Sequence, residues 1–428
     1  MTPSLVGLMS LGGVLALIIL RVPIAVALFV VTGIGTYALV GLAPALSILS
    51  TVPYNFASSW TLSTVPMFLL MGYVAFHSGL TRGLFEAARL WLGWLPGGLA
   101  IASIFGAGGF ASVTGSSVAC SAAIGRIAVP EMLARGYDIR VATGSVAAGG
   151  TIGALIPPSL LLILFGIYAQ VSITQLFAWG AVVGLASIVM YCLAILVLFF
   201  VAPDRLPRAE TFTLKERLLV LRKIGPTLTL VLLVFGGLFA GYFTATEAGA
   251  IGALFATIIG FAAGGLTRAK FVESCVDTLM SCGGLFIIAI AANAFTRLVA
   301  LTDLSQVIGF WFTDMGFSTT GLLIAISAIY LILGMFLDPL GAMLLTLPIY
   351  LPLLTDHGVD FIWFGILLAK LLEMGMITPP VGLNVFVIHG IFKNSVRLEQ
   401  IFAGIVPFFI ADLVLIAGML AMRHFIAL

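Results

Sequence analysis

One segment of this chain recurs 222 residues further on, and the two copies align without a gap. GALIPPS at 153–159 corresponds to GMITPPV at 375–381, so a Gly-x-x-x-Pro-Pro pattern stands at the same place in each copy. The same offset relates three further residues to their partners: Pro130, Gly136 and Asp138 to Pro352, Gly358 and Asp360. Proline lacks a backbone N–H and disrupts an α-helix. Each copy is therefore predicted to contain a helix that breaks at its Pro-Pro pair.

The composition places these helices in a membrane. Of the 428 residues, 61% are hydrophobic and only 8% are charged, against about 25% charged residues in a soluble domain. Apolar runs long enough to span a bilayer recur along the chain, for example at 5–20, 24–42, 181–202, 226–242 and 400–422. The first run lacks the basic start of a cleaved signal and is predicted to be a span.

The chain divides into two halves around its longest polar stretch. We predict a first repeat at 1–205, a cytoplasmic linker at 206–224 and a second repeat at 225–428. The stretch 203–224 carries nine charged residues, among them Arg208 and Glu210. It is interpreted as a linker with an amphipathic helix that lies on the membrane surface.

The distribution of Lys and Arg predicts that the two repeats are inverted. If 5–20 crosses from outside to inside, so that the N-terminus is periplasmic, 16 of the 19 basic residues fall on the inner side. This asymmetry follows the positive-inside rule. The same topology puts Pro130–Asp138 inside and its copy Pro352–Asp360 outside. A repeat of opposite sidedness is typical of secondary transporters, whose sites lie near the midplane between the repeats.

Each repeat also contains a segment that is too interrupted for a simple span. These segments are 98–130, with SVTGSS at 112–117, and 318–354, centred on GMFLDPLG at 334–341. Irregular backbone at membrane depth is tolerated where protein or a water-filled cavity surrounds it. We therefore predict two re-entrant hairpins, which accompany broken helices at 140–169 and 361–390. The expected fold is an all-α polytopic membrane protein of two inverted-topology repeats.

The hairpin tips and the helix breaks supply oxygen atoms for a small cation. Backbone carbonyls that are freed at a break can bind a hard ion, and hydroxyl or carboxylate groups can complete its shell. The predicted cation ligands are Ser112, Thr114, Gly115, Ser116, Gly149, Gly153 and Pro157 in the first repeat, and Gly334, Asp338, Gly375, Thr378 and Pro379 in the second. The offset pairs Ser116 with Asp338, which is the strongest acidic candidate because an ionisable group at membrane depth is costly.

The solute is predicted to lie beside the same breaks. The N-terminus of each following half-helix presents N–H groups that favour an anion. The predicted solute-binding residues are Ser116, Ser117, Ser159, Thr378 and Asn384. The offset aligns Asn384 with Leu162, so the repeat symmetry is broken there, as a site for an asymmetric solute requires.

Four other charged residues are predicted near membrane depth. Lys370 and Glu373 are three residues apart on one helix face, a spacing at which they can pair. Glu247 and Asp412 are interpreted as bridges between packed helices. The four cysteines and four histidines show no spacing typical of a metal centre or a catalytic triad, so an intramembrane enzyme is disfavoured. No organic cofactor and no nucleic-acid partner are expected.

These motifs together resemble the large membrane subunit of TRAP transporters (tripartite ATP-independent periplasmic transporters, DctM type). The most specific parts are the Gly-Ser-Ser hairpin followed by PEM at 130–132, GALIPPS, the LGMFLD–Pro hairpin and GMITPPVGLN at 375–384. At Cys120 and Ser121 the chain departs from the family pattern, which has an acidic or small residue in that region.

The resemblance implies a sodium-coupled importer of organic acids in the bacterial inner membrane, working by an elevator mechanism. It implies dicarboxylates, sialic acid or other sugar acids as solutes. It also implies two partners, a small membrane subunit (DctQ type) and a periplasmic substrate-binding protein (DctP type). Two sodium ions are implied, one between Ser112–Ser117 and Gly149–Pro158, the other between Gly334–Asp338 and Gly375–Pro380. The alternative is a sodium/dicarboxylate symporter that needs no binding protein. A passive channel is disfavoured because hairpins indicate alternating sites.

Overall fold

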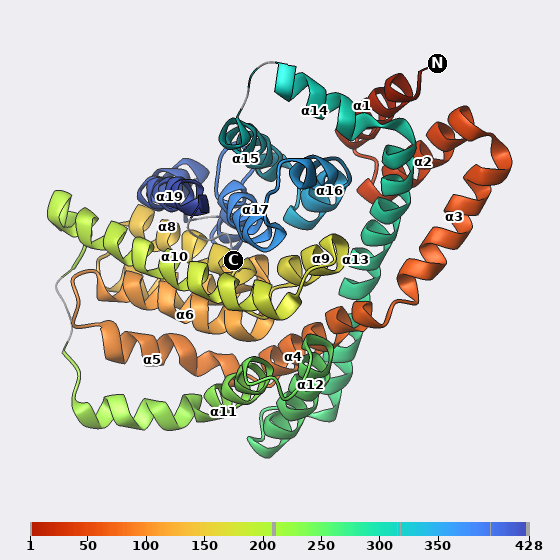
Figure 1. Ribbon diagram of the computed structural model, residues 1–428. Helices are drawn as coiled ribbons and strands as arrows, with labels where there is room; N and C mark the ends of the chain where they lie inside the picture. The colour runs from red at the N-terminus through yellow and green to blue at the C-terminus, as the bar shows by residue number, and fades with distance from the viewer. Residues whose placement is uncertain (1, 208–210, 315, 317, 394, 425–428) are drawn as a thin grey trace. The chain divides into compact units, whose positions relative to one another are not determined.

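The structure is a computed structural model that describes residues 2–207, 211–314, 316, 318–393 and 395–424 (Figure 1). Arg208 and Glu210 of the predicted linker lie outside these residues. The described chain consists of helices and short connections, without a strand, as the predicted all-α fold requires.

The first repeat contains ten α-helices within the described residues. They are α1 (Pro3–Ile19), α2 (Ile24–Val40), α3 (Leu42–Ala57), α4 (Thr64–His77), α5 (Gly83–Leu92), α6 (Gly98–Thr114), α7 (Ser117–Ala134), α8 (Ile139–Thr151), α9 (Leu160–Ala169) and α10 (Ile173–Val201).

The remaining α-helices of the described chain follow the polar stretch. They are α11 (Leu214–Phe239), α12 (Ala245–Ala262), α13 (Arg268–Thr302), α14 (Leu304–Asp314), α15 (Thr319–Phe336), α16 (Pro339–Asp356), α17 (Phe361–Gly375), α18 (Leu383–Ile391) and α19 (Leu398–Ala421).

The helix bounds recur at the offset found in the sequence. Adding 222 to the bounds of α7 gives 339 and 356, which are the bounds of α16. The same shift brings α6, α8, α9 and α10 close to α15, α17, α18 and α19. The repeat is thus one of helix positions as well as of motifs. The opposite sidedness of its two copies stays a prediction from the charges.

Many of these helices are suited to a bilayer. Eight helices among the described residues are long and apolar enough to cross a membrane. A ninth crossing is reached if the pair Leu42–Ala57 and Trp60–His77, bent by 58°, counts as one span. The predicted multi-pass membrane protein is confirmed at this level.

The described chain forms two compact units, each assembled from both repeats. The smaller comprises Met1–Ser63, Leu279–Ile329 and Leu340–Phe361; within it α1 packs on α2, and α2 on α3. The larger comprises Thr64–Thr278, Tyr330–Pro339 and Ile362–Leu428. All of the predicted site residues belong to the larger unit.

Helix α8 runs through the core of the larger unit. Val141 to Thr151 are all buried, and the helix packs against α6, α7 and α19. Its run of Ala, Gly, Ser and Thr has little side-chain volume, which lets neighbouring backbones approach closely. At Gly144 a Cβ would collide with the backbone of Gly404 in α19. This close packing places the end of α8, and so the first helix break, inside the unit.

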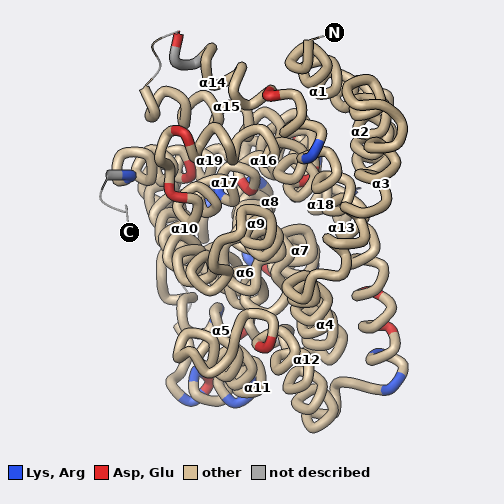
Figure 2. Tube along the Cα trace, turned by 45° about the vertical axis from the view of Figure 1, so that its right-hand side comes forward, with Lys and Arg blue, Asp and Glu red and all other residues tan. Residues whose placement is uncertain are grey.

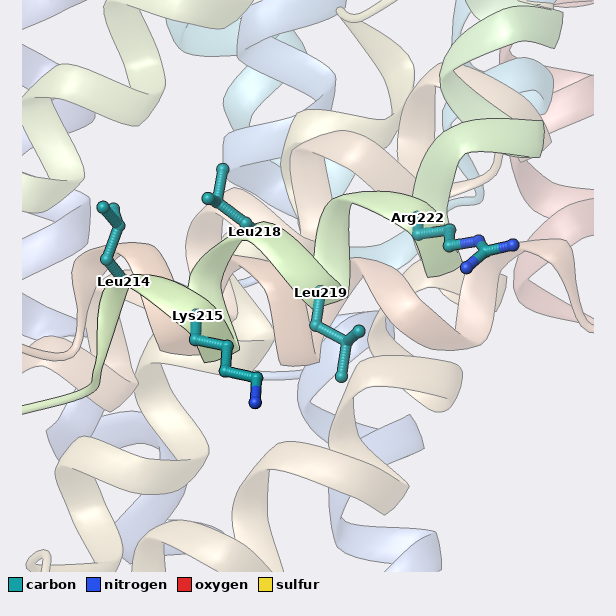
Figure 3. Close-up of a pocket in the computed structure, with 5 residues that line it drawn as sticks. All are labelled: Leu214, Lys215, Leu218, Leu219 and Arg222. Carbon is teal, nitrogen blue, oxygen red and sulfur yellow. The ribbon is translucent and has the colours of Figure 1, made fainter.

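Helix α11 continues past residue 224, the predicted end of the linker. It starts at Leu214 with a capping box between Thr213 and Glu216, and it continues through Pro226 to Phe239. Its first turns border a shallow surface hollow that is lined by Leu214, Lys215, Leu218, Leu219 and Arg222 (Figure 3). Apolar and basic side chains on one short stretch agree with the predicted amphipathic character. The surface helix and the following apolar segment are therefore one continuous helix.

The charged side chains of α5 pair with neighbouring helices. Glu86 accepts from Lys223 of α11 at 2.9 Å, and Arg89 forms an ion pair with Glu131 of α7. Figure 2 shows Lys and Arg residues gathered around α5 and the start of α11 in the larger unit.

Glu247 does not bridge two helices as predicted. It closes a capping box with Thr244 at the start of its own helix, α12, because a carboxylate at the third helical position satisfies the free N–H of the cap residue.

Candidate functional site

The first helix break lies where the Pro-Pro pair predicts it. Helix α8 ends at Thr151, a 3-10 turn follows over Ile152–Ala154, and α9 starts at Leu160. Ser159 caps α9, since its hydroxyl accepts from the N–H of Leu162 at 3.2 Å and donates to the carbonyl of Ala154. The Pro157–Pro158 peptide bond is cis.

The first hairpin turns at Gly115 and Ser116. Gly115 ends α6 in the left-handed conformation (φ +61°), which a residue with a Cβ rarely adopts. Ser116 caps α7 by accepting from the N–H of Ala119 at 3.4 Å. The two helices pack against each other, and the Cys120 thiol reaches the carbonyl of Ala107 at 3.2 Å. The predicted helical hairpin is therefore present, while its re-entry into the membrane from one side stays a prediction.

The hairpin tip lies directly on the first break. A Cβ at Gly115 would collide with the carbonyl oxygen of Pro158. A Cβ at Gly153 would lie 3.0 Å from the backbone N and Cα of Ser117. Glycine is required at both positions because backbone meets backbone there. The structure thus brings together the tip and the break between which the first sodium ion is implied; each such pair is called a half-site below.

Most hydroxyls of the tip bond to their own hairpin. Ser112 donates to the carbonyl of Gly109 at 2.7 Å, and Thr114 donates to that of Phe110 at 3.1 Å. Such bonds to the preceding turn are the usual way of satisfying hydroxyls in apolar helices. Ser117 differs, since its hydroxyl donates to the Glu373 carboxylate of the second repeat at 2.7 Å.

The second break follows Gly375 at the end of α17. Thr378 donates its hydroxyl to the carbonyl of Met374 at 2.6 Å, and the N–H of Asn384 donates to the carbonyl of Met376 at 3.1 Å. Gly382 (φ +61°) precedes α18, and the Pro379–Pro380 bond is cis. Local bonds thus hold the segment between the two half-helices.

The second break is also approached by the end of helix α15. A Cβ at Gly375 would lie 2.6 Å from the backbone of Gly334, so these two glycines are in direct backbone contact. Helix α15 ends two residues later at Phe336, and Asp338 is the last residue before α16. Asp338 therefore has the same position before α16 that Ser116 has before α7, and its side chain is exposed.

Two hydrogen bonds connect the first hairpin and α8 to the two half-helices of the second break, α17 and α18. One is the Ser117–Glu373 bond, and the other joins Asn384 Nδ2 to the carbonyl of Ala147 at 3.4 Å. Within the described chain, Glu373 Oε2 and Asn384 Oδ1 are buried and have no hydrogen-bond partner. Buried acceptor oxygens are costly unless a donor or a cation satisfies them. These two oxygens therefore fit the binding of a small cation by oxygen ligands.

The predicted pairing of Lys370 with Glu373 is wrong. Lys370 Nζ instead lies 2.5 Å from Asp412 Oδ1 of α19, and both side chains are at most 1% exposed. The Asp412 carboxylate also accepts from the Tyr191 hydroxyl of α10 at 2.8 Å. The interpretation of Asp412 as a bridge between packed helices is confirmed. Glu373 is thereby left to face the first hairpin.

Sequence reasoning missed Tyr191 and undervalued Glu373. Tyr191 lies in an apolar run without a motif, so no local pattern indicated it. A signal was nevertheless available. The 222-residue offset makes α10 equivalent to α19, and Tyr191 is next to Met190, the counterpart of Asp412. Glu373 corresponds by the offset to Thr151, another buried polar residue just before a break.

The potential ligands of this region are oxygen atoms, most of them from neutral groups. Among the described residues, no group of three or more His, Cys, Asp or Glu side chains is placed to hold a metal ion. Carbonyls, hydroxyls, an amide and the carboxylates of Glu373 and Asp338 are oxygen ligands, which suit a hard cation better than a soft transition metal.

Comparison with known proteins gives a consistent result. Residues 11–425 match the family described as "Tripartite ATP-independent periplasmic transporter, DctM component". The chain is 34% identical over 339 residues to the C4-dicarboxylate TRAP transporter large permease protein DctM of Pseudomonas aeruginosa, covering 78% of each protein. It is 28% identical to the sialic acid TRAP transporter large permease protein SiaM of Vibrio cholerae, covering 84% of this chain and 83% of that protein.

A solved structure shares the fold. The YdaH transporter of Alcanivorax borkumensis, described as having an unusual topology, superposes with a TM-score of 0.65. The alignment covers 90% of this chain and 89% of that one at 16% sequence identity.

Proposed function

This chain belongs to the DctM component family of tripartite ATP-independent periplasmic transporters, and from that premise we propose that it carries an organic acid into the cell together with sodium ions. It is the large permease subunit of such a transporter. The observation that carries the proposal is the contact of the first hairpin tip with a broken helix, Gly115 against Pro158 and Gly153 against Ser117. A small movement of the hairpin tip would open or close access to a ligand that is bound at this contact.

Sodium is the proposed cation. Sodium is hard and monovalent, and it is bound by carbonyl and hydroxyl oxygens of the kind present at both breaks. We assign one ion to the region of Gly115, Ser116 and Gly153, and one to the region of Asp338 and Gly375. The unpartnered oxygens of Glu373 and Asn384 support an ion-binding role for this region.

The solute is proposed to be a carboxylate. Two relatives are named for C4-dicarboxylates and for sialic acid, and both solutes carry carboxylate groups. In this chain the N-termini of α9 and α18 follow the two breaks, and helix N-termini favour anions. Ser117, Ser159, Thr378 and Asn384 are proposed to orient the solute through hydrogen bonds.

The transport cycle is proposed to be of the elevator type. The two broken helices and the first hairpin share hydrogen bonds and backbone contacts, so they can move as one body that carries the site across the membrane. A small membrane subunit and a periplasmic binding protein are the proposed partners. The basic residues around α5 and α11 support the proposal that this end of the larger unit faces the cytoplasm.

The test is uptake of radiolabelled C4-dicarboxylate or sialic acid into proteoliposomes that contain this chain with its small subunit. The binding protein, loaded with solute, is added outside, with or without an inward sodium gradient. We expect accumulation only with all three proteins and only with the gradient. Equal uptake without the gradient would contradict the sodium coupling, while uptake by this chain alone would favour a symporter that needs no binding protein.

A further inference from the structure

A chain of buried polar contacts joins the two broken helices by a route that avoids the proposed ion sites. Thr151 of α8 and the Tyr191 hydroxyl of α10 lie 3.1 Å apart. Tyr191 donates to Asp412 of α19 at 2.8 Å, and Asp412 pairs with Lys370 of α17 at 2.5 Å. The contacts thus run from the first broken helix to the second through four helices.

The contacts are strengthened by burial and by aromatic packing. Lys370 Nζ lies 5.1 Å from the centre of the Tyr191 ring and 3.4 Å from its hydroxyl, so one aromatic side chain serves both charged partners. The Tyr191 ring packs edge-on against Phe408 at 5.4 Å. All of these side chains are fully or almost fully buried. Water does not compete there, and each contact is electrostatically stronger than it would be at a surface.

The position of the chain of contacts relates it to both breaks. Thr151 is the last residue of α8, directly before the first break, and Lys370 lies less than two turns before Gly375. The linking helices, α10 and α19, correspond to each other by the 222-residue offset. Each repeat thus contributes one broken helix and one linking helix.

The residues that form this chain of contacts are not repeated in the other copy. The offset pairs Lys370 with Ala148, Asp412 with Met190, and Tyr191 with Leu413. Lys370 and Asp412 both belong to the second repeat, and their counterparts Ala148 and Met190 cannot form an ion pair. The contact that joins the two repeats is the hydrogen bond from Tyr191 to Asp412.

Separating the two broken helices would break this chain of contacts at a high cost in free energy. Moving α17 without α19 would leave a buried ammonium and a buried carboxylate without partners. Moving α8 without α10 would leave the Thr151 and Tyr191 hydroxyls to find other partners. These contacts therefore favour two kinds of arrangement. In one, both broken helices have their ion-binding geometry, and in the other, neither has it.

We propose that Lys370, Asp412 and Tyr191 form a coupling bridge through which a sodium ion in one half-site raises the sodium affinity of the other. This inference rests on the proposed sodium coupling. The three side chains are positioning residues, since they act through the broken helices and not by contact with the ion. Coupling of this kind requires a physical element that both sites bias, and the bridge is such an element.

The test uses the Tyr191→Phe variant in the complete transporter. This substitution keeps the ring and its packing against Phe408 while it removes the hydroxyl that joins Thr151 to Asp412. The matched control is Ser187→Ala, one turn away on α10, where the buried hydroxyl donates to the carbonyl of Val183 in its own helix. The measurement is the Hill coefficient for sodium in binding-protein-dependent uptake.

We expect a Hill coefficient near two for the wild type and the control, and near one for Tyr191→Phe. Uptake at saturating sodium should stay within about twofold of the wild type, because each half-site is intact. Thr151→Val, which keeps the side-chain shape and removes the hydroxyl that meets Tyr191, should give the same fall and serves if the first variant is not recovered. A merely stabilising contact would lower the melting temperature and leave the Hill coefficient unchanged.

The outcomes separate the two proposals. A cooperative wild type with an equally cooperative Tyr191→Phe variant would overturn the coupling bridge and leave sodium-driven transport intact. Wild-type uptake that does not depend on sodium would overturn the proposed function and the bridge with it. A reduced Hill coefficient in the Ser187→Ala control as well would also count against the bridge, because any change in α10 would then suffice.

Discussion

At the scale of single residues, the larger unit contains buried charges that are satisfied by specific partners. The larger unit buries Lys370, Glu373 and Asp412 together, and each has a defined partner. An isolated charge in such a setting is very costly, whereas a paired and hydrogen-bonded charge is tolerated. The spacing of Lys370 and Glu373 suggested a local pair. The tertiary structure gives Lys370 to Asp412, because α19 brings that carboxylate within 2.5 Å.

The Lys370–Asp412 pair predicts a particular pattern of stability. Lys370→Met leaves a buried carboxylate unpaired and should lower the free energy of unfolding in mixed micelles by about 3–5 kcal/mol. Asp412→Leu should cost a similar amount. The double variant, with two apolar side chains of similar size, should recover most of the loss. Losses that simply add in the double variant would show that the two residues do not interact.

At the scale of structural elements, close backbone contacts fix the positions of both helix breaks. The first hairpin tip touches the first break at Gly153, and α15 touches the end of α17 where Gly334 meets Gly375. These contacts rely on the absence of a side chain, so they are sensitive to the addition of a single methyl group. The two breaks are thus held by shape as well as by hydrogen bonds.

Gly375→Ala tests the contact in the second repeat. The added Cβ would lie 2.6 Å from the Gly334 backbone, which cannot move aside as a side chain can. The displacement should cost about 1–3 kcal/mol, and if this cost falls on ion binding, sodium affinity should drop about 5- to 150-fold. The control is Gly418→Ala in α19, where a Cβ would meet nothing within 4 Å. Thermal stabilisation by sodium measures the affinity, and equal values for both variants would contradict the argument.

The elements were predictable from the sequence to an unequal degree. The repeated Pro-Pro motif located both breaks, and SVTGSS located the first hairpin turn, because glycine and proline act locally on the backbone. The end of the linker at 224 was not predictable, since α11 continues through Pro226 and carries its polar and apolar parts in one helix. The bridge through Tyr191 was not predictable either, because a tertiary contact selects its members.

At the scale of the whole chain, the central feature is a duplicated set of helices whose two site regions belong to one compact unit. The helix bounds recur at 222 residues, and the larger unit takes segments from both repeats. Symmetry gives the two half-sites a common plan. Departures from symmetry, Ser116 against Asp338 and Leu162 against Asn384, are proposed to give them different ligands, as the transport of an asymmetric solute requires.

The most direct test of this account is the number of sodium ions that the purified transporter binds. Radioactive sodium is titrated onto this chain and its small subunit in lipid nanodiscs, and the saturating stoichiometry is compared among variants. The account predicts two ions per chain for the wild type, one for Ser116→Ala and one for Asp338→Asn, since each substitution removes a ligand from one half-site. A wild type that binds no sodium, or two variants that both keep the full complement, would contradict it.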